Sequence, residues 1–206
     1  MVTRARRAAS GTFRVYLRHP TAGDARRFSA AVEESRRLHR SWVNAPSTPA
    51  AFRTYLSRFA GSGHGGQHAG YLVVRIEDEA LLGVLNFSEI VRGAFRSTYV
   101  GYYAFAPHTG CGYMTEALVL ALDEAFGTLS LHRVEANVQP ANLRSIALVE
   151  RLGFTREGYS RRYVKIAGRW RDHVRYAMLA EEWKKLRPRR ARTATANRQA
   201  RARGSG

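Results

Sequence analysis

The tripeptide Gly110-Cys111-Gly112 stands directly before a segment with helical periodicity. Apolar residues recur at three- and four-residue steps from Met114 to Leu129, which predicts a helix with one face on a core. The first turn of a helix has unpaired N–H groups and the positive end of the helix dipole. Glycine also lets a ligand approach the main chain closely. The junction therefore suits a pyrophosphate, and a tight turn that merely starts the helix is the plain alternative.

Other chemistry at this loop finds less support in the sequence. No lysine follows the glycines as a Walker A loop requires, and Thr115 stands where a dinucleotide fingerprint needs its third glycine. Cys111 has no histidine and asparagine placed to activate it, so we do not expect a nucleophile there. His64 and His68 are four residues apart in a glycine-rich loop rather than on a helix, and we expect no metal site.

The elements that must position this loop follow the order βααβββαβαββ. A final hairpin turns at Ala167-Gly168, and the other strand patterns cover residues 12–20, 71–77, 81–90, 98–106 and 133–139. Helical patterns cover residues 21–40, 49–60, 113–129 and 142–153. Because connections between the strands are short, we expect an α/β fold with a mixed, mostly antiparallel twisted sheet that is flanked by helices.

The composition indicates one folded domain with basic ends. The chain has 206 residues and a formal charge of +18, with three Arg in residues 1–11 and nine Lys or Arg in residues 184–206. Neither end contains an acid, so we expect a basic N-terminal tail (1–11), a domain (12–183) and a basic, disordered C-terminal tail (184–206). A single cysteine excludes an internal disulfide and suits a reducing compartment, so we expect a cytoplasmic protein. No apolar run approaches the roughly 18 residues of a membrane span.

Three stretches taken together resemble a known family. They are GYYAFAPHTGCGYMTEAL (101–118), HRVEANVQPANLRSIALVERLGF (132–154) and YVKIAGRWRDH (163–173). In this combination they resemble the GNAT N-acetyltransferases, and most of all the RimJ-like enzymes that acetylate an N-terminal alanine of a ribosomal protein. The resemblance covers about residues 12–180. One position departs from it, because Pro107 stands where a polar side chain usually begins the phosphate loop.

The resemblance implies a site for acetyl-coenzyme A (acetyl-CoA) in an opening between the fourth and fifth strands, and no metal. Pantetheine would pair with the main chain at Tyr103, Ala104 and Phe105, and Asn142 and Ser145 would lie near the thioester. The pyrophosphate would meet main-chain amides of the loop, at Thr109, Gly110, Cys111, Gly112 and Tyr113.

The catalytic residues follow from the resemblance less directly. Many relatives use a tyrosine as the acid at the position of Val149, so that role does not transfer. Some use a serine at the position of Ser145, although Asn142 and Ser145 also suit an ordinary helix start. Glu135 is the candidate base, with Glu89 as a competitor, and a salt bridge to an arginine is the structural alternative. Deprotonation through ordered water, without a dedicated base, stays open.

The acceptor implied by the resemblance is a ribosomal protein with an alanine N-terminus. A small-molecule amine acetyltransferase is the alternative among enzymes. A ribosome- or RNA-associated module that keeps a CoA pocket without turnover is the alternative from another class. The basic tail at 184–206 is expected either to be plainly solvated or to attract phosphates of ribosomal RNA.

Overall fold

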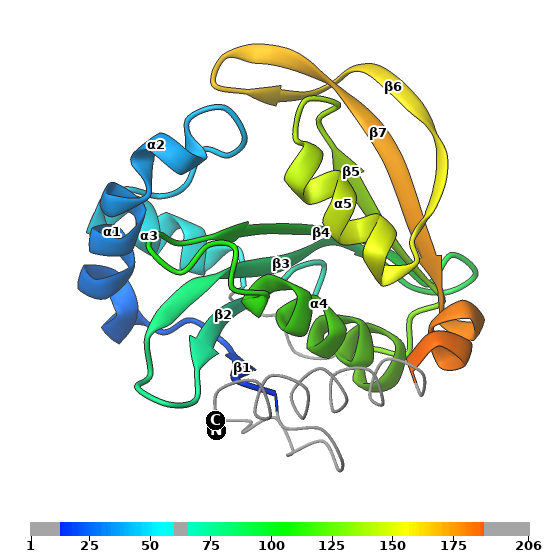
Figure 1. The fold of residues 1–206 in the computed structure, drawn as a ribbon, viewed down its shortest axis with the longest axis horizontal. Coiled ribbons are helices and arrows are strands. Elements are labelled where there is room, and N and C mark those ends of the chain that lie inside the picture. The colour runs from blue at the N-terminus through cyan, green and yellow to red at the C-terminus, as the bar shows by residue number, and fades with distance from the viewer. Residues whose placement is uncertain (1–12, 60–65, 188–206) are drawn as a thin grey trace, which may run out of the picture.

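A seven-stranded sheet forms the centre of the protein in a computed structural model that describes residues 13–59 and 66–187 (Figure 1). Its strand order is β1-β2-β3-β4-β5-β7-β6, and all neighbours are antiparallel except the pair β4–β5. The strands are β1 (Val15–Arg18), β2 (Ala69–Arg75), β3 (Leu81–Val91), β4 (Ser97–Ala104), β5 (Arg133–Val138), β6 (Thr155–Ile166) and β7 (Arg169–Leu179). The predicted α/β class and element order are confirmed, with two short helical segments added, α2 and a segment after β7.

Helices pack on both faces of this sheet. The strands alternate their side chains accordingly, so on β2 Tyr71 and Val73 join one buried cluster while Leu72 and Val74 join the other. The first cluster lies under α4 (Tyr113–Asp123) and α5 (Leu143–Leu152), which Figure 1 shows in front of the sheet. The second lies under α1 (Ala25–Glu34) and α3 (Pro49–Ser57), and α2 (Arg36–His39) connects to the same side.

The helix ends follow from local residue chemistry. The side chain of Thr48 accepts a hydrogen bond from the Ala51 N–H, and Pro49 takes the first helical position of α3. Gly153 ends α5 with a φ of 85°, a left-handed conformation that glycine adopts without strain. The predicted helix to about Leu129 is found as α4 followed by one π-helical turn, Glu124–Thr128.

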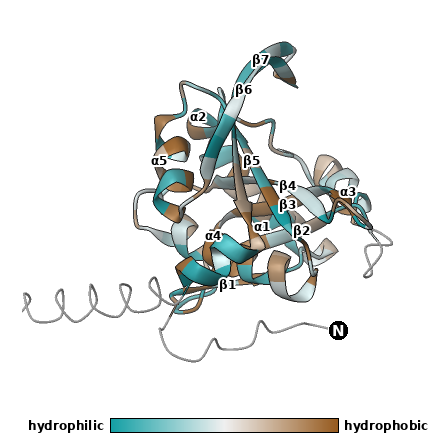
Figure 2. Cartoon of the chain, turned by 90° about the vertical axis from the view of Figure 1, so that its right-hand side faces the viewer, coloured by the Kyte–Doolittle hydropathy of each residue, from teal (hydrophilic) through white to brown (hydrophobic). Residues whose placement is uncertain are grey.

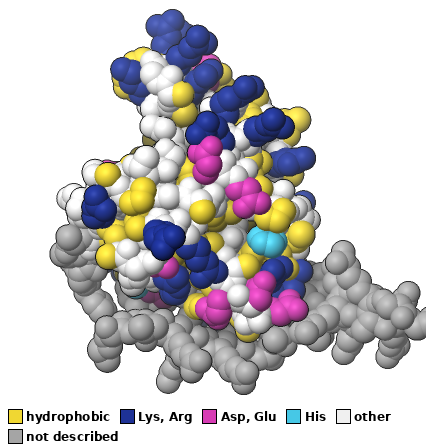
Figure 3. Space-filling model, turned by 90° about the vertical axis from the view of Figure 1, so that its left-hand side faces the viewer, with side chains coloured by type: hydrophobic (Ala, Val, Ile, Leu, Met, Phe, Trp, Pro, Cys, Tyr) yellow, Lys and Arg dark blue, Asp and Glu magenta, His cyan; other side chains and the backbone are white. Residues whose placement is uncertain are grey.

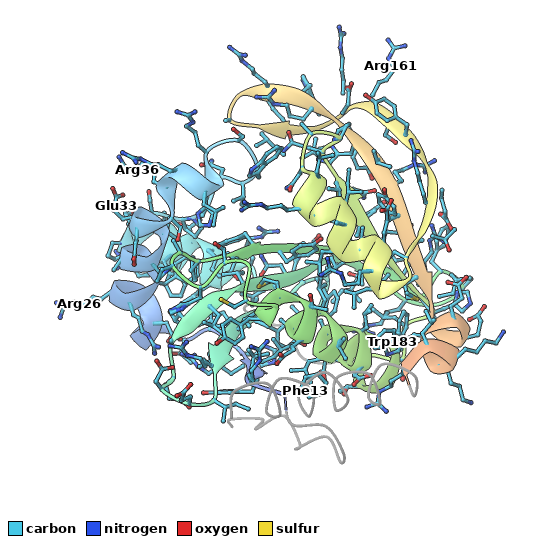
Figure 4. The ribbon with its side chains drawn as sticks, viewed as in Figure 1. Phe13, Arg26, Glu33, Arg36, Arg161 and Trp183 are labelled. Carbon is cyan, nitrogen blue, oxygen red and sulfur yellow. The ribbon has the colours of Figure 1, made fainter. Side chains whose placement is uncertain are left out.

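The chain continues as a helix over residues 180–187 after β7. Trp183, labelled in Figure 4, is 3% exposed, and its indole N–H donates to Asp123 at 3.0 Å. Arg187 also pairs with Asp123 at 2.6 Å. The domain boundary expected at 183 therefore falls inside this helix. The N-terminal tail, His64 and residues 188–206 of the C-terminal tail lie outside the described residues. No helix in the described part of the chain is long and apolar enough to cross a membrane.

A buried histidine joins the helical layer to β4. His39 donates from Nε2 to the carbonyl oxygen of Ala104 at 2.8 Å. Its Nδ1 is buried and has no hydrogen-bond partner among the described residues. Burial lowers the pKa of His39 below its ordinary value of 6.5, and it lowers the pKa of His173 in the same way. Both rings are therefore expected to be neutral in the folded state near pH 7.

Because both histidines have a lower pKa in the folded state than in the unfolded state, we expect the free energy of unfolding to decrease as the pH is lowered below about 6.5. Between 6.5 and the lower pKa of the folded state, the unfolded chain binds more protons, so acidification favours unfolding. We expect the melting temperature to fall from pH 7.5 to 5.5, and to fall less in the double variant His39→Gln/His173→Gln. Glutamine keeps an N–H donor and does not titrate. An equal fall in the parent and the variant would show that other groups cause the pH dependence.

Candidate active site

The strands β4 and β5 are joined at one end only. They pair in parallel at three positions, from Ser97 opposite Arg133 to Tyr99 opposite Glu135. Beyond Tyr99 the two strands are not paired, although β4 continues to Ala104. The middle of the sheet therefore has a V-shaped opening (the V), whose edges carry main-chain groups that can bond to an extended ligand.

The glycine loop lies between the end of β4 and the start of α4. Gly110 and Gly112 have φ values of 80° and 83°, which disfavour other residues, and Gly112 caps α4. A β-carbon at Gly110 would meet no atom within 4 Å, so the surface above the loop is open. The predicted strand–loop–helix junction is thus present, with the geometry that an anion needs at the start of an eleven-residue helix.

Arg14 lies against this loop, just before β1. Its Nη2 donates to the carbonyl oxygen of Cys111 at 2.9 Å, and its Nε donates to Glu116 at 2.7 Å. The guanidinium also lies 4.5 Å from the ring centroid of Tyr113. Arg14 therefore places a guanidinium group, which is paired with Glu116, beside the loop, where Pro107 can supply no polar contact. Arg14 was not predicted from sequence, because it is 97 residues away from Cys111 in the chain.

The three predicted pantetheine positions on β4 are not equivalent. Phe105 is fully buried, and its N–H donates to the carbonyl of Leu82 on β3 at 2.8 Å. Peptide groups alternate sides along a strand, so Tyr103 also faces β3 while Ala104 and Tyr102 face the V. The carbonyl of Ala104 is occupied by His39, which leaves its N–H as the group of this trio that points toward a ligand.

Two hydroxyl groups meet across the V. Tyr102 on β4 and Ser145 in the first turn of α5 lie with Oη and Oγ 2.6 Å apart. Asn142 caps α5 by accepting the N–H of Ser145 at 3.2 Å, which engages its Oδ1 and leaves Nδ2 available to a coenzyme. Burial raises the pKa of Tyr102 to about 12, which keeps the phenol protonated at neutral pH. Ser145 was predicted from sequence, and Tyr102 was not.

The candidate base Glu135 is held in a salt bridge. Its Oε1 accepts from Arg133 Nε at 2.9 Å, and Arg133 also pairs with Glu157. The salt bridge was the structural alternative in the sequence analysis, and it ties this carboxylate to a cation instead of leaving it free to take a proton. The competitor Glu89 is exposed near the end of β3. Val149 is fully buried in the core, in keeping with its having no acid role.

A second polar cluster lies on the other face of the sheet. Val134, Ala136 and Val138 face α4 and α5, so Asn137 between them faces the opposite way. There its Nδ2 donates to Tyr163 Oη at 3.5 Å, and its Oδ1 is buried without a partner among the described residues. The Tyr163 ring stands edge-on to His173 at 5.7 Å. We call this face, on the side of α1 to α3, the acceptor face.

The described residues contain no group of three or more His, Cys, Asp or Glu side chains that could hold a metal ion. The arrangement offers a different kind of chemistry. It combines an anion site at a helix start, an opening for an extended ligand, a hydroxyl pair at that opening, and a separate polar face beyond it.

Comparison with known proteins agrees with this geometry. The family model described as "Acetyltransferase (GNAT) domain" matches residues 14–155. The solved structure of Mycobacterium smegmatis RimJ in complex with CoA-disulfide superposes with a TM-score of 0.76 at 30% identity, and covers 82% of this chain and 83% of that one. The [Ribosomal protein uS5]-alanine N-acetyltransferase of Escherichia coli is 43% identical over 107 residues, or 52% of this chain and 55% of that protein.

The spermidine N(1)-acetyltransferase of Vibrio cholerae is also similar, with 29% identity over 111 residues, 54% of this chain and 64% of that protein. The chain spans about half the length of the first curated relatives that it matches.

Proposed function

Because the chain belongs to the GNAT acetyltransferase family, we propose that it transfers the acetyl group of acetyl-CoA to the α-amino group of a protein N-terminus. The observation that carries the proposal is the V between β4 and β5, which opens next to the glycine loop of Gly110 and Gly112. The loop suits a phosphate group, and the V suits an extended arm. A coenzyme A thioester has both parts in one molecule.

Several groups of this chain would hold that ligand. The amides from Thr109 to Tyr113 bind the pyrophosphate, and the Arg14 guanidinium, which also pairs with Glu116, lies at the same place. The N–H of Ala104 bonds the pantetheine arm. The thioester then lies near the start of α5, where Ser145 and Tyr102 meet.

The hydroxyl pair acts on the leaving group. A thiol has an ordinary pKa of about 8.5, whereas that of Tyr102 is about 12, so complete proton transfer from Tyr102 to the thiolate is uphill. Ser145 and Tyr102 therefore stabilise the developing thiolate by donating a hydrogen bond, and the proton lost by the attacking amine ends on sulfur. This role differs from that of the proton-donating acid expected from sequence.

An N-terminal amine suits a site whose candidate carboxylate base, Glu135, is already held in a salt bridge. Its ordinary pKa is about 7.7–8.0, so about a third of it is neutral at pH 7.5, against roughly 0.1% of a lysine ε-amine with a pKa near 10.4. Glu135 is paired with Arg133, so the site favours the amine of which the largest fraction is already neutral. Ordered water then relays the proton of the attacking amine to the sulfur of the leaving thiolate.

The similarity to a ribosomal-protein alanine N-acetyltransferase supports a ribosomal protein with an N-terminal alanine as the acceptor. The similarity to a spermidine acetyltransferase supports a second candidate, a polyamine. Charge on the acceptor face disfavours the polyamine: Arg175 lies opposite Asn137 in the β5–β7 register, and Arg171 lies on the same face of β7 as His173. A polycation would need free carboxylates there.

The test compares acceptors at equal concentration in a free-thiol assay. We expect a peptide with an alanine N-terminus to be acetylated at least about tenfold faster than spermidine or an N-terminally blocked lysine peptide at pH 7.5, because far more of its amine is neutral. Mass spectrometry of the product would locate the acetyl group. Faster acetylation of spermidine would contradict the proposed substrate, and acetylation of none of the three would contradict the proposed activity.

A further inference from the structure

The outer end of the β6–β7 hairpin is strongly basic. Residues 161–171 contain five cations and no acid, namely Arg161, Arg162, Lys165, Arg169 and Arg171. We call this segment the basic hairpin. It projects from the body as a largely hydrophilic ribbon (Figure 2), and dark-blue side chains gather at the top of the molecule in Figure 3. Arg161, labelled in Figure 4, points away from the fold.

These cations form no close ion pair with the residues that the structure describes. All of them are exposed except Arg171, which is half-buried. The ion pairs among the described residues include none of the five, whereas Arg14, Arg18, Arg75 and Arg133 are each paired elsewhere. The next carboxylate along the chain, Asp172, accepts hydrogen bonds from the Tyr159 hydroxyl and the Arg162 N–H. One acid beside five cations leaves a strongly positive field.

An aromatic ring accompanies these charges. Trp170 is 60% exposed and lies directly opposite Lys165 in the β6–β7 register, so both side chains project from one face of the ribbon. Val164 is also 40% exposed. Exposing a large apolar tryptophan ring to water is unfavourable. An exposed ring next to an ammonium group also offers a flat stacking surface inside a positive field.

We propose that the basic hairpin binds single-stranded RNA. Phosphates match the five cations, and an unpaired base has a planar face that can stack on Trp170. An acidic polypeptide would satisfy the charges but not the ring. Only the choice of RNA over DNA rests on the proposed function, since a ribosomal protein is surrounded by RNA. The binding itself needs no acetyl transfer, so it can be tested separately.

The first test removes charge. In fluorescence polarisation with a labelled twelve-nucleotide oligouridine, the full chain carrying Arg161→Gln/Lys165→Gln/Arg169→Gln should bind at least about tenfold more weakly than the parent. The slope of log affinity against log salt should become shallower by about 2, from roughly 0.7 for each lost phosphate contact. The matched control Arg26→Gln/Arg27→Gln/Arg53→Gln removes three exposed cations from α1 and α3 and should change neither value by much.

The second test removes the ring. Trp170→Ala should weaken binding roughly tenfold with an unchanged salt slope, because stacking is not a counterion effect. Equal binding by the hairpin and control triple variants would overturn the proposal, and so would unchanged binding by Trp170→Ala. Competition by polyglutamate as effective as that by RNA of equal charge would also overturn it, in favour of an acidic polypeptide partner.

Discussion

Gly110→Asp is expected to weaken acetyl-CoA binding by about 100-fold. The main chain at Gly110 has a φ of 80°, and a β-carbon there meets no atom within 4 Å, so the new carboxylate has room beside the proposed pyrophosphate. Two unit charges about 4 Å apart near a protein surface repel by about 4 kcal/mol, and solvent screening at an open loop reduces this to about 2–3 kcal/mol. Isothermal titration calorimetry with acetyl-CoA would measure the loss.

The matched control is Gly110→Asn, which has nearly the same shape and tolerates the left-handed conformation about as well as aspartate does. It should bind within about fivefold of the parent, so that the difference between the two variants isolates the charge. Gly110 is preferred to Gly112 for this test, because a β-carbon at Gly112 would lie 3.3 Å from Arg14 Nη2 and an acid there would find a cation. Equal affinities of the Asp and Asn variants would place the phosphates elsewhere.

The sequence was enough to predict those parts of the fold that depend on local residue chemistry. The apolar positions of 113–129 face the core because helical periodicity demands it, and Ala117, Leu118, Ala121 and Leu122 are all buried. The Thr48-Pro49 start, the Gly153 end and the turn at Ala167-Gly168 follow from capping and turn preferences in the same way.

Contacts between distant segments could not be predicted in this way. Arg14 reaches the glycine loop only because β1 lies beside α4 in the folded chain, and Tyr102 meets Ser145 from 43 residues away. Strand alternation alone would have placed Tyr102 on the α5 side, but the distance between the hydroxyls depends on how far β4 and β5 separate. That separation is a property of the whole sheet.

The salt bridge between Arg133 and Glu135 could have been predicted from the sequence. Arg133 and Glu135 are two apart on a strand and therefore share a face, which is the spacing of a salt bridge along one edge. The same alternation shows why Phe105 does not face the V: its peptide group points to β3, as does that of Tyr103. Applying the period of two to main-chain groups as well as side chains would have singled out Ala104.

Ser145→Ala and Tyr102→Phe are each expected to lower kcat by about 10- to 1000-fold, with little change in acetyl-CoA affinity. Each variant removes one hydroxyl of the pair that is 2.6 Å apart at the start of α5. A hydrogen bond that strengthens as the thiolate develops is made in the transition state and not in the ground state, so its loss appears in kcat. Pre-steady-state kinetics and calorimetry on the same samples would separate the two quantities.

The double variant decides whether the hydroxyls work as a unit. If Tyr102 acts by holding and polarising Ser145, the double variant should be about as slow as the slower single variant. Removing either hydroxyl already interrupts the hydrogen bonding from Tyr102 through Ser145 to the thiolate. Multiplied losses would mean that each group bonds the thiolate independently. Tyr159→Phe removes a hydroxyl from an exposed tyrosine outside the site and should leave kcat unchanged. Full activity of Ser145→Ala would remove the serine from the mechanism and leave the Tyr102 hydroxyl or ordered water to donate the hydrogen bond that stabilises the leaving thiolate.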